Sequence, residues 1–176
     1  MNLSHKLRLA LILFVLGCTV GCDQTTKHLA RRELKERGSV TLPGGLGEFR
    51  LAENPGSFLS LGDSLPKSLR VAIFTIAVGI GLFSLLVYLL FGGRFSWFVF
   101  VGLGLFWAGG MSNLIDRIWR DGLVSDFIFL RVGPFHTGVF NLADVVIMIG
   151  GAMIVYDIWL RRRIHNPKHS TLDSSR

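Results

Sequence analysis

The stretch VAIFTIAVGIGLFSLLVYLLF, from Val71 to Phe91, contains no charged residue and no amide side chain. A helix of about 20 apolar residues is long enough to cross the roughly 30 Å hydrocarbon core of a bilayer. The stretch therefore predicts a membrane-spanning helix, and it assigns the chain to the membrane proteins rather than to the soluble ones.

Three further apolar blocks accompany it. They are Leu9 to Gly21, which is short for a span, Phe95 to Ile115, which has no charge, and Val139 to Leu160, which contains two Asp. Half of the 176 residues are hydrophobic and the mean hydropathy is +0.49, which is rare for a soluble domain of this size. We predict a mainly α, polytopic membrane protein: one domain with four transmembrane helices over residues 1–163, then a polar, disordered tail over residues 164–176.

A net charge of +7 is also found in proteins that bind nucleic acid. No zinc-finger spacing or RNA-binding aromatic motif accompanies it, so no nucleic-acid partner is expected. Basic residues beside membrane spans explain the charge. Arg161-Arg162-Arg163, directly after the fourth block, predicts that both termini lie in the cytoplasm, although a plain count of Lys and Arg over the loops does not follow the positive-inside rule.

The first block has an alternative interpretation, because VLGC and TVGC at residues 15–18 and 19–22 look like the cleavage site of a bacterial lipoprotein precursor. A mature lipoprotein that began at either Cys would still carry three spans, whereas lipoproteins are usually soluble domains on a lipid tether. We therefore predict a retained helix. Cys18 and Cys22 would share one rigid helix face, which disfavours a disulfide, and we expect both to pack as small apolar residues.

The connections between the blocks have two characters. Thr25 to Gly38 contains no helix breaker before its last residue and predicts a short amphipathic helix on the membrane surface. Residues 39–66 alternate apolar residues with Gly and Pro and predict short strands and turns, and Val124 to Val132 has the same strand-like pattern. We expect these two β-prone segments to pair on one side of the membrane.

Ionisable and amide side chains gather at one end of the predicted spans. Burial of such groups near the membrane costs free energy, so they usually have a function there. Asn113 and Arg117 share a face at the end of the third span, and Asn141 and Asp144 share a face at the start of the fourth. Asp126 lies in the connection between them. These groups are expected to converge on one polar site at the membrane boundary.

Asp126 and Asp144 suggest acid–base chemistry. Two neighbouring carboxyl groups do not both ionise easily, so one keeps its proton while the other stays charged. The ionised group takes a proton from water as it attacks a peptide carbonyl, and the protonated group delivers one to the leaving nitrogen. The amide groups of Asn113 and Asn141 can hydrogen-bond a substrate backbone, and Arg117 can hold a substrate carbonyl or orient a carboxylate.

Plainer roles stay open for the same residues. Asp144 is equally suited to the positive end of a helix dipole, and Asp126 to a solvated strand end. Structural roles are expected for four further sets: Asp116 paired with Arg117, Asp23 paired with Lys27, Asp157 paired with nearby basic residues, and His136 solvated in a loop. No spacing resembles a metal-ligand set, a phosphate loop or a Ser nucleophile, so neither a metal nor a cofactor is expected.

Five motifs occur in order along nearly the whole chain: Asp23-Gln24 with Lys27, Asn54-Pro55-Gly56, Asn113-Leu114-Ile115-Asp116-Arg117, Ser125-Asp126-Phe127, and Phe140-Asn141-Leu142-Ala143-Asp144. With them the chain resembles lipoprotein signal peptidase, or signal peptidase II, a bacterial intramembrane aspartic protease. The resemblance implies four transmembrane helices in the inner membrane, a periplasmic β-cradle and cytoplasmic termini.

The resemblance also implies a catalytic dyad, which falls on Asp126 and Asp144. The residues that it implies for substrate binding or support are Asn54, Gly56, Asn113, Arg117, Asn141, Asp23 and Lys27. The implied substrate is a diacylglyceryl-modified prolipoprotein, cut just before the lipidated Cys. We expect a monomer surrounded by membrane lipid.

Two positions depart from the family pattern. Phe58 follows Asn54 one residue earlier than in the usual Asn-x-Gly-Ala-Ala-Phe, and Ser112 stands where Gly is usual. These departures bear on loop shape and inhibitor sensitivity more than on activity. A small membrane transporter or scaffold is the alternative from another class, but it predicts polar groups throughout the depth of the spans, whose middles are bare here.

Overall fold

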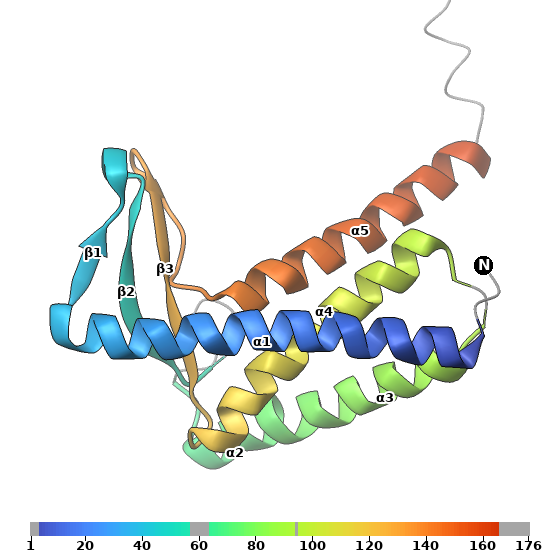
Figure 1. The fold of residues 1–176 in the computed structure, drawn as a ribbon, viewed down its shortest axis with the longest axis horizontal. Coiled ribbons are helices and arrows are strands. Elements are labelled where there is room, and N and C mark those ends of the chain that lie inside the picture. Colours follow the sequence, from blue (N-terminus) through green and yellow to red (C-terminus); the bar gives the residue numbers. More distant parts are fainter. Residues whose placement is uncertain (1–3, 57–63, 94, 166–176) are drawn as a thin grey trace, which may run out of the picture.

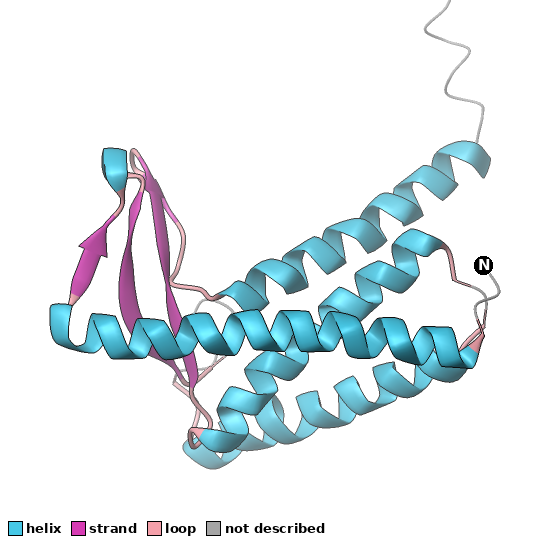
Figure 2. Ribbon diagram, in the orientation of Figure 1, coloured by secondary structure: helices cyan, strands magenta, loops and turns pink. Residues whose placement is uncertain are grey.

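Four helices in the computed structural model are long and apolar enough to cross a membrane, as predicted. The structure describes residues 4–56, 64–93 and 95–165. The helices form a bundle, and a small antiparallel sheet lies at one end of it, here called the sheet end (Figures 1 and 2). Phe58 and the tail from residue 166 onward lie outside the described residues.

The first helix, α1 (His5–Arg37), is continuous over 33 residues. The Ser4 hydroxyl accepts a hydrogen bond from the Leu7 N–H at its start, and Gly38, at φ 77°, ends it. At 1.5 Å per residue it is about 50 Å long, which exceeds the roughly 30 Å of hydrocarbon. The segment predicted as a separate surface helix is therefore helical, but it continues the first span beyond the bundle and beneath the sheet (Figure 1).

Cys18 and Cys22 are both free and exposed on α1, so the prediction that they serve as small apolar packing residues is wrong. The buried face of α1 instead carries Ile12, Thr19 and Asp23. Because the first span is apolar on all sides over this part, its sequence does not mark which face turns inward.

The second span is built from three segments: α2 (Lys67–Val71), a π-helical segment η3 (Ala72–Ala77) and α3 (Val78–Phe91). The end of α3 is held by α1, since the Arg8 guanidinium donates to the carbonyl oxygens of Gly92 and Gly93 at 2.8 and 3.1 Å. This contact fixes the first two spans to each other at the end opposite the sheet.

Helices α4 (Trp97–Trp119) and α5 (Leu142–His165) run side by side at close range (Figure 1). A Cβ atom added to Gly150 would lie 2.4 Å from the carbonyl oxygen of Gly102, and one on Gly109 would lie 2.7 Å from that of Ala143. Glycine at these positions lets the two backbones touch, as small residues do between membrane helices. The start of α5 is thereby held against the last turns of α4.

The sheet has four antiparallel strands in the order β1 (Ser39–Thr41), β2 (Gly47–Asn54), β3 (Val124–Val132) and β4 (Phe135–His136). The predicted pairing of the two β-prone segments is confirmed as β2 against β3, and β3 has the predicted bounds. Side chains alternate along β3, so Phe127 packs on Ala30 and Leu34 of α1 while Asp126 faces the other side.

At the opposite end of the bundle, the predicted local pairing of Asp157 is confirmed. Its carboxylate accepts hydrogen bonds from Arg161 Nε at 2.5 Å and from Ser96 Oγ at 2.7 Å. Helix α5 runs through His165, so the first two residues of the predicted tail are helical. His136 is exposed, as expected for a solvated residue, but it lies in β4 and not in a loop.

Candidate active site

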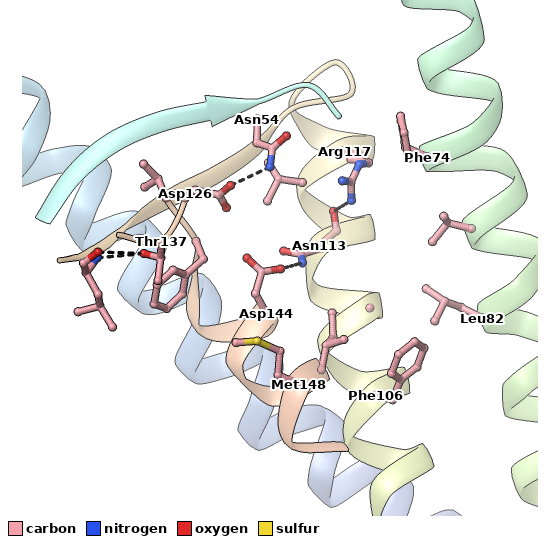
Figure 3. A pocket seen from close by; sticks show the side chains of 18 residues that line it. Asn54, Phe74, Leu82, Phe106, Asn113, Arg117, Asp126, Thr137, Asp144 and Met148 are labelled. Atoms are coloured by element: carbon pink, nitrogen blue, oxygen red, sulfur yellow. Dashed lines mark hydrogen bonds between the residues drawn. The ribbon is translucent and has the colours of Figure 1, made fainter. Parts of the chain in front are cut away.

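A cavity of about 460 Å³ lies at the sheet end, between the sheet, the π segment, α3, α4 and α5 (Figure 3). Asp126 from β3 and Asp144 from α5 both line it, together with Asn54, Asn113 and Arg117. The predicted convergence of these groups from separate segments is what the structure shows. Gly56, Asn141, Asp23 and Lys27, the remaining predicted site residues, are buried around the cavity.

Asn141 connects the two carboxyl groups. Its side-chain Nδ2 donates to Asp126 Oδ1 at 2.7 Å, and its backbone N–H donates to Asp144 Oδ2 at 3.0 Å. The Asp144 N–H returns a hydrogen bond to Asn141 Oδ1 at 3.0 Å, which makes a reciprocal N-terminal cap for α5. Asp144 therefore caps the start of α5 and also lines the cavity, so the helix-terminal role left open for it is confirmed and its acid–base role stays a prediction.

Two more amides complete the contacts of the carboxyl groups. Asn54 Nδ2 donates to Asp126 Oδ2 at 2.9 Å, and Asn113 Nδ2 donates to Asp144 Oδ1 at 2.9 Å. Each of the four carboxyl oxygens thus accepts an N–H group. Asn54 is itself held by the Gly56 N–H, which donates to its side-chain oxygen at 3.0 Å. The orientation of both carboxyl groups is fixed by neutral donors.

Burial raises the pKa of Asp126 from 3.8 to about 6. The hydrogen bond from Asn54 acts against this rise, the negative charge of Asp144 adds to it, and the Asn141 hydrogen bond and the Lys27 charge lower the pKa. Asp126 is only 2% exposed, so loss of hydration outweighs its two amide donors. This carboxyl group therefore changes protonation near neutral pH instead of near pH 4.

Asn54→Ala is expected to move this titration to higher pH. The amide favours the ionised carboxylate, so its loss raises the pKa of Asp126 further above about 6. The pH profile of kcat/KM should therefore show its limb near pH 6 displaced to the alkaline side. The rate at the optimum should fall roughly 2- to 12-fold, since one hydrogen bond is worth about 0.5 to 1.5 kcal/mol.

Glu53→Gln is the matched control for this profile. Glu53 neighbours Asn54 on β2, but it is exposed and pairs with Arg120 at 2.7 Å. Its substitution should leave the limb in place. A limb that is unmoved in Asn54→Ala, or displaced equally in both variants, would contradict a contribution of Asp126 to this titration.

A buried ion cluster supports the site from α1. Lys27 is fully buried, and its Nζ lies 2.7 Å from Asp23 Oδ2, 3.0 Å from Asp116 Oδ2 and 2.9 Å from Asn113 Oδ1. The three protons of the ammonium group thus have three acceptors. The predicted pair of Asp23 with Lys27 is confirmed, and its third contact ties the cluster to the amide that holds Asp144.

The predicted ion pair of Asp116 with Arg117 is wrong. Asp116 pairs with Lys27, whereas Arg117 donates to the backbone oxygens of Asn113 and Gly56 at 3.4 and 2.6 Å. Consecutive residues on a helix point about 100° apart, so neighbours in sequence do not face each other. The partner of Asp116 comes from another helix, which sequence spacing does not reveal.

Three residues have roles that sequence reasoning missed, although each stands in or beside a recognised motif. Gln24 Nε2 donates to Asp116 Oδ1 at 3.0 Å, and the Ser125 N–H donates to Asp116 Oδ2 at 3.2 Å. Ser112 Oγ donates to Asp23 Oδ2 at 2.6 Å. The signal available was adjacency, since each precedes or follows a predicted site residue.

Four carboxyl groups and two basic groups lie in or directly beside the cavity: Asp23, Asp116, Asp126 and Asp144, with Lys27 and Arg117. Loss of hydration and the negative charge of Asp144 raise the pKa of Asp126, which favours the protonated form of that carboxyl group. Within the described ranges, no three His, Cys, Asp or Glu side chains are grouped so as to hold a metal ion. The arrangement is suited to proton transfer between paired carboxyl groups.

Comparison with known proteins gives a consistent result. A family model described as signal peptidase (SPase) II matches residues 15–160. A lipoprotein signal peptidase of Syntrophus aciditrophicus is 31% identical over 153 residues, which are 87% of this chain and 94% of that one. One of Borreliella burgdorferi is 29% identical over 173 residues, covering 94% and 99%.

Solved structures also resemble this fold. One, described as a bacterial membrane enzyme solved by the in meso method at 2.3 Å resolution, gives a TM-score of 0.72 at 24% identity, and covers 92% of this chain and 93% of that chain. A second, at 1.9 Å, gives a TM-score of 0.73, also at 24% identity, with 85% and 92% covered. At this level of identity, the structural likeness shows the fold alone.

Proposed function

The chain belongs to the signal peptidase II family and is a multi-pass lipoprotein signal peptidase, and from this membership we propose that it is an aspartic endopeptidase whose dyad is Asp126 and Asp144. The substrate is a diacylglyceryl-modified prolipoprotein, which is cut just before its lipidated Cys. One observation carries the mechanism: a single buried residue, Asn141, donates to both carboxyl groups at the edge of a cavity.

The dyad works with one shared proton. The ionised carboxylate takes a proton from water while the water oxygen bonds to the scissile carbonyl carbon, and the protonated carboxyl hydrogen-bonds the carbonyl oxygen. The tetrahedral intermediate then collapses, the C–N bond breaks, and a carboxyl group delivers a proton to the leaving nitrogen. Because the two groups are coupled, their apparent pKa values belong to the pair.

The rest of the cavity suits a lipidated peptide. Phe74, Leu82, Phe106 and Met148 supply apolar walls on the side that faces into the bundle (Figure 3). Arg117 also lines the cavity, and its guanidinium group suits a substrate carbonyl. Apolar walls accept the hydrophobic segment and acyl chains, and the polar rim aligns the peptide bond.

The proposed setting is the bacterial inner membrane, with the sheet end in the periplasm, both termini in the cytoplasm and a monomeric enzyme. The cluster of titratable groups at one end of the bundle supports a site at the membrane surface rather than the transporter alternative. Arg161, Arg162 and Arg163 at the opposite end support the orientation.

This orientation predicts a labelling pattern. In a background with both native cysteines replaced by Ala, Thr41→Cys in β1 should react with a membrane-impermeant maleimide on intact spheroplasts. Ile164 is 69% exposed near the end of α5, and Ile164→Cys should react only after permeabilisation. Labelling of position 164 but not of position 41 in intact spheroplasts would show that the orientation is the reverse of the one proposed.

The reaction itself is tested with purified protein in detergent and a prolipoprotein that carries the diacylglyceryl group. Mass spectrometry should detect a mature chain that begins at the lipidated Cys. The same prolipoprotein without the lipid is the control for substrate class. Cleavage at another bond, or equal cleavage of both forms, would contradict the proposed specificity, and activity that a chelator removes and a divalent ion restores would contradict the aspartic mechanism.

A further inference from the structure

Ser112 of α4 makes a buried contact between helices that the proposed mechanism does not use. Its side chain is fully buried, and its hydroxyl donates to Asp23 Oδ2 on α1 at 2.6 Å. Gln24 Nε2 donates to the same hydroxyl oxygen at 3.2 Å and to the Ser112 carbonyl oxygen at 3.2 Å. The hydroxyl is thus held in one direction, with its proton aimed at the Asp23 carboxylate.

The other oxygen of Asp23 reaches a third helix. Asp23 Oδ1 accepts the backbone N–H of Ala143 at 2.9 Å, and both residues are fully buried. Ala143 lies in the first turn of α5 and directly precedes Asp144. The N-terminal N–H groups of a helix have no partner within the helix, so an external carboxylate there fixes the position of the turn.

We propose that Ser112 is a positioning residue for peptide cleavage, acting through Asp23 on the first turn of α5 and hence on the direction of Asp144. This replaces the expectation from sequence that Ser112, which stands where Gly is usual in the family, bears little on activity. This inference rests on the proposed dyad. Neither Ser112 nor Asp23 lines the cavity. Their effect on the reaction therefore passes through the backbone that carries Asp144.

The contacts of the carboxylate show why the hydroxyl matters. Asp23 Oδ2 is shared between the Ser112 hydroxyl and the Lys27 ammonium, while Oδ1 alone meets the Ala143 N–H. Without the hydroxyl, Lys27 is the only hydrogen-bonding partner of Oδ2 among the described residues, so the attraction of Lys27 for the carboxylate is opposed only by the Ala143 N–H at Oδ1. A displacement of about 1 Å in a reacting group can cost on the order of 100-fold in rate.

The test compares Ser112→Ala with Ser96→Ala. Ser96 is a matched control because its hydroxyl also donates to an Asp of another helix, Asp157 of α5, but at the opposite end of α4. Ser112→Ala is expected to lower kcat about tenfold, with KM changed less than about twofold, as the loss of a transition-state arrangement does. Ser96→Ala is expected to lower the melting temperature through loss of an N-cap, with kcat unchanged.

A double-mutant comparison separates positioning from general weakening. In the Asp23→Asn background, Ser112→Ala should change kcat less than about twofold, because the path through Asp23 is already altered. Independent effects that multiply, or an unchanged kcat in Ser112→Ala, would overturn the inference. Should Ser112→Ala not yield folded protein, Ser112→Cys keeps the side-chain volume with a weaker donor, and the same loss of kcat at constant KM is required of it.

Asp126→Asn is measured in the same series, so that two failures stay distinct. Near wild-type turnover in folded Asp126→Asn would remove the proposed dyad and the inference with it. Loss of turnover in Asp126→Asn together with normal kcat in Ser112→Ala would remove the positioning role alone.

Discussion

Asp126→Asn and Asp144→Asn are each expected to lower the cleavage rate of a lipidated prolipoprotein by at least about 10³-fold while the protein stays folded. General acid–base catalysis by one group is typically worth about 10² to 10⁴ in rate, and removal of either carboxyl disables the shared proton. Asn keeps the shape of the side chain but neither ionises nor carries a transferable proton. The loss should therefore appear in kcat, with substrate binding largely retained.

The control for this comparison is Asp121→Asn. Asp121 is 77% exposed in the turn after α4, where it pairs with Lys67, so the same change of side chain there should leave the rate near that of the wild type. Rates are compared on protein that elutes as one monodisperse species. A folded Asp126→Asn or Asp144→Asn variant that retained more than about a tenth of wild-type kcat would contradict the dyad.

Lys27→Met should lower the free energy of unfolding by about 3 to 5 kcal/mol, because removal of one partner from a buried ion pair leaves an uncompensated charge. Here the carboxylates of Asp23 and Asp116 lose the cation that they share, and Asn113 loses a donor to its side-chain oxygen. Met has a similar length and fills the same space. The midpoint of thermal unfolding in detergent should fall by roughly 6 to 20 °C.

Lys67→Met provides the comparison for that shift. The Lys67–Asp121 pair is exposed, at 60% and 77%, and exposed pairs contribute about 0 to 1 kcal/mol. Its midpoint should move by a few degrees at most. Equal shifts in the two variants would show that the buried cluster does not stabilise the junction of α1 with α4.

The membrane spans and the β3 strand were predictable because their signals are local. Val71 to Phe91 is long and uncharged, and Val124 to Val132 alternates within a short run bounded by turns. The convergence of Asp126, Asp144 and Asn141 was predictable from one further argument, the high cost of polar groups at membrane depth. All three residues lie at or between the same ends of the third and fourth predicted spans, which is why they were expected to meet.

Features that depend on which helix faces which were not predictable in this way. The ion pair expected within the Asp116-Arg117 dipeptide is absent from the described structure, because the cation that Asp116 meets comes from α1. Cys18 and Cys22 are exposed because packing selected another face of an evenly apolar helix. Such facts depend on helix rotation, which no short sequence window contains.

We expect the continuity of α1 to protect the enzyme from the cleavage that is proposed for its substrates. The stretches that imitate a lipoprotein cleavage site end at Cys18 and Cys22, in the middle of a helix whose backbone N–H and C=O groups are bonded to one another. Hydrolysis needs an exposed, extended peptide bond that water can approach. The residue after Cys22 is the buried Asp23, which is held by α4 and α5. Because unwinding this segment for self-cleavage would dismantle the support of Asp144, we expect the folded enzyme to be a poor substrate for a second copy of itself.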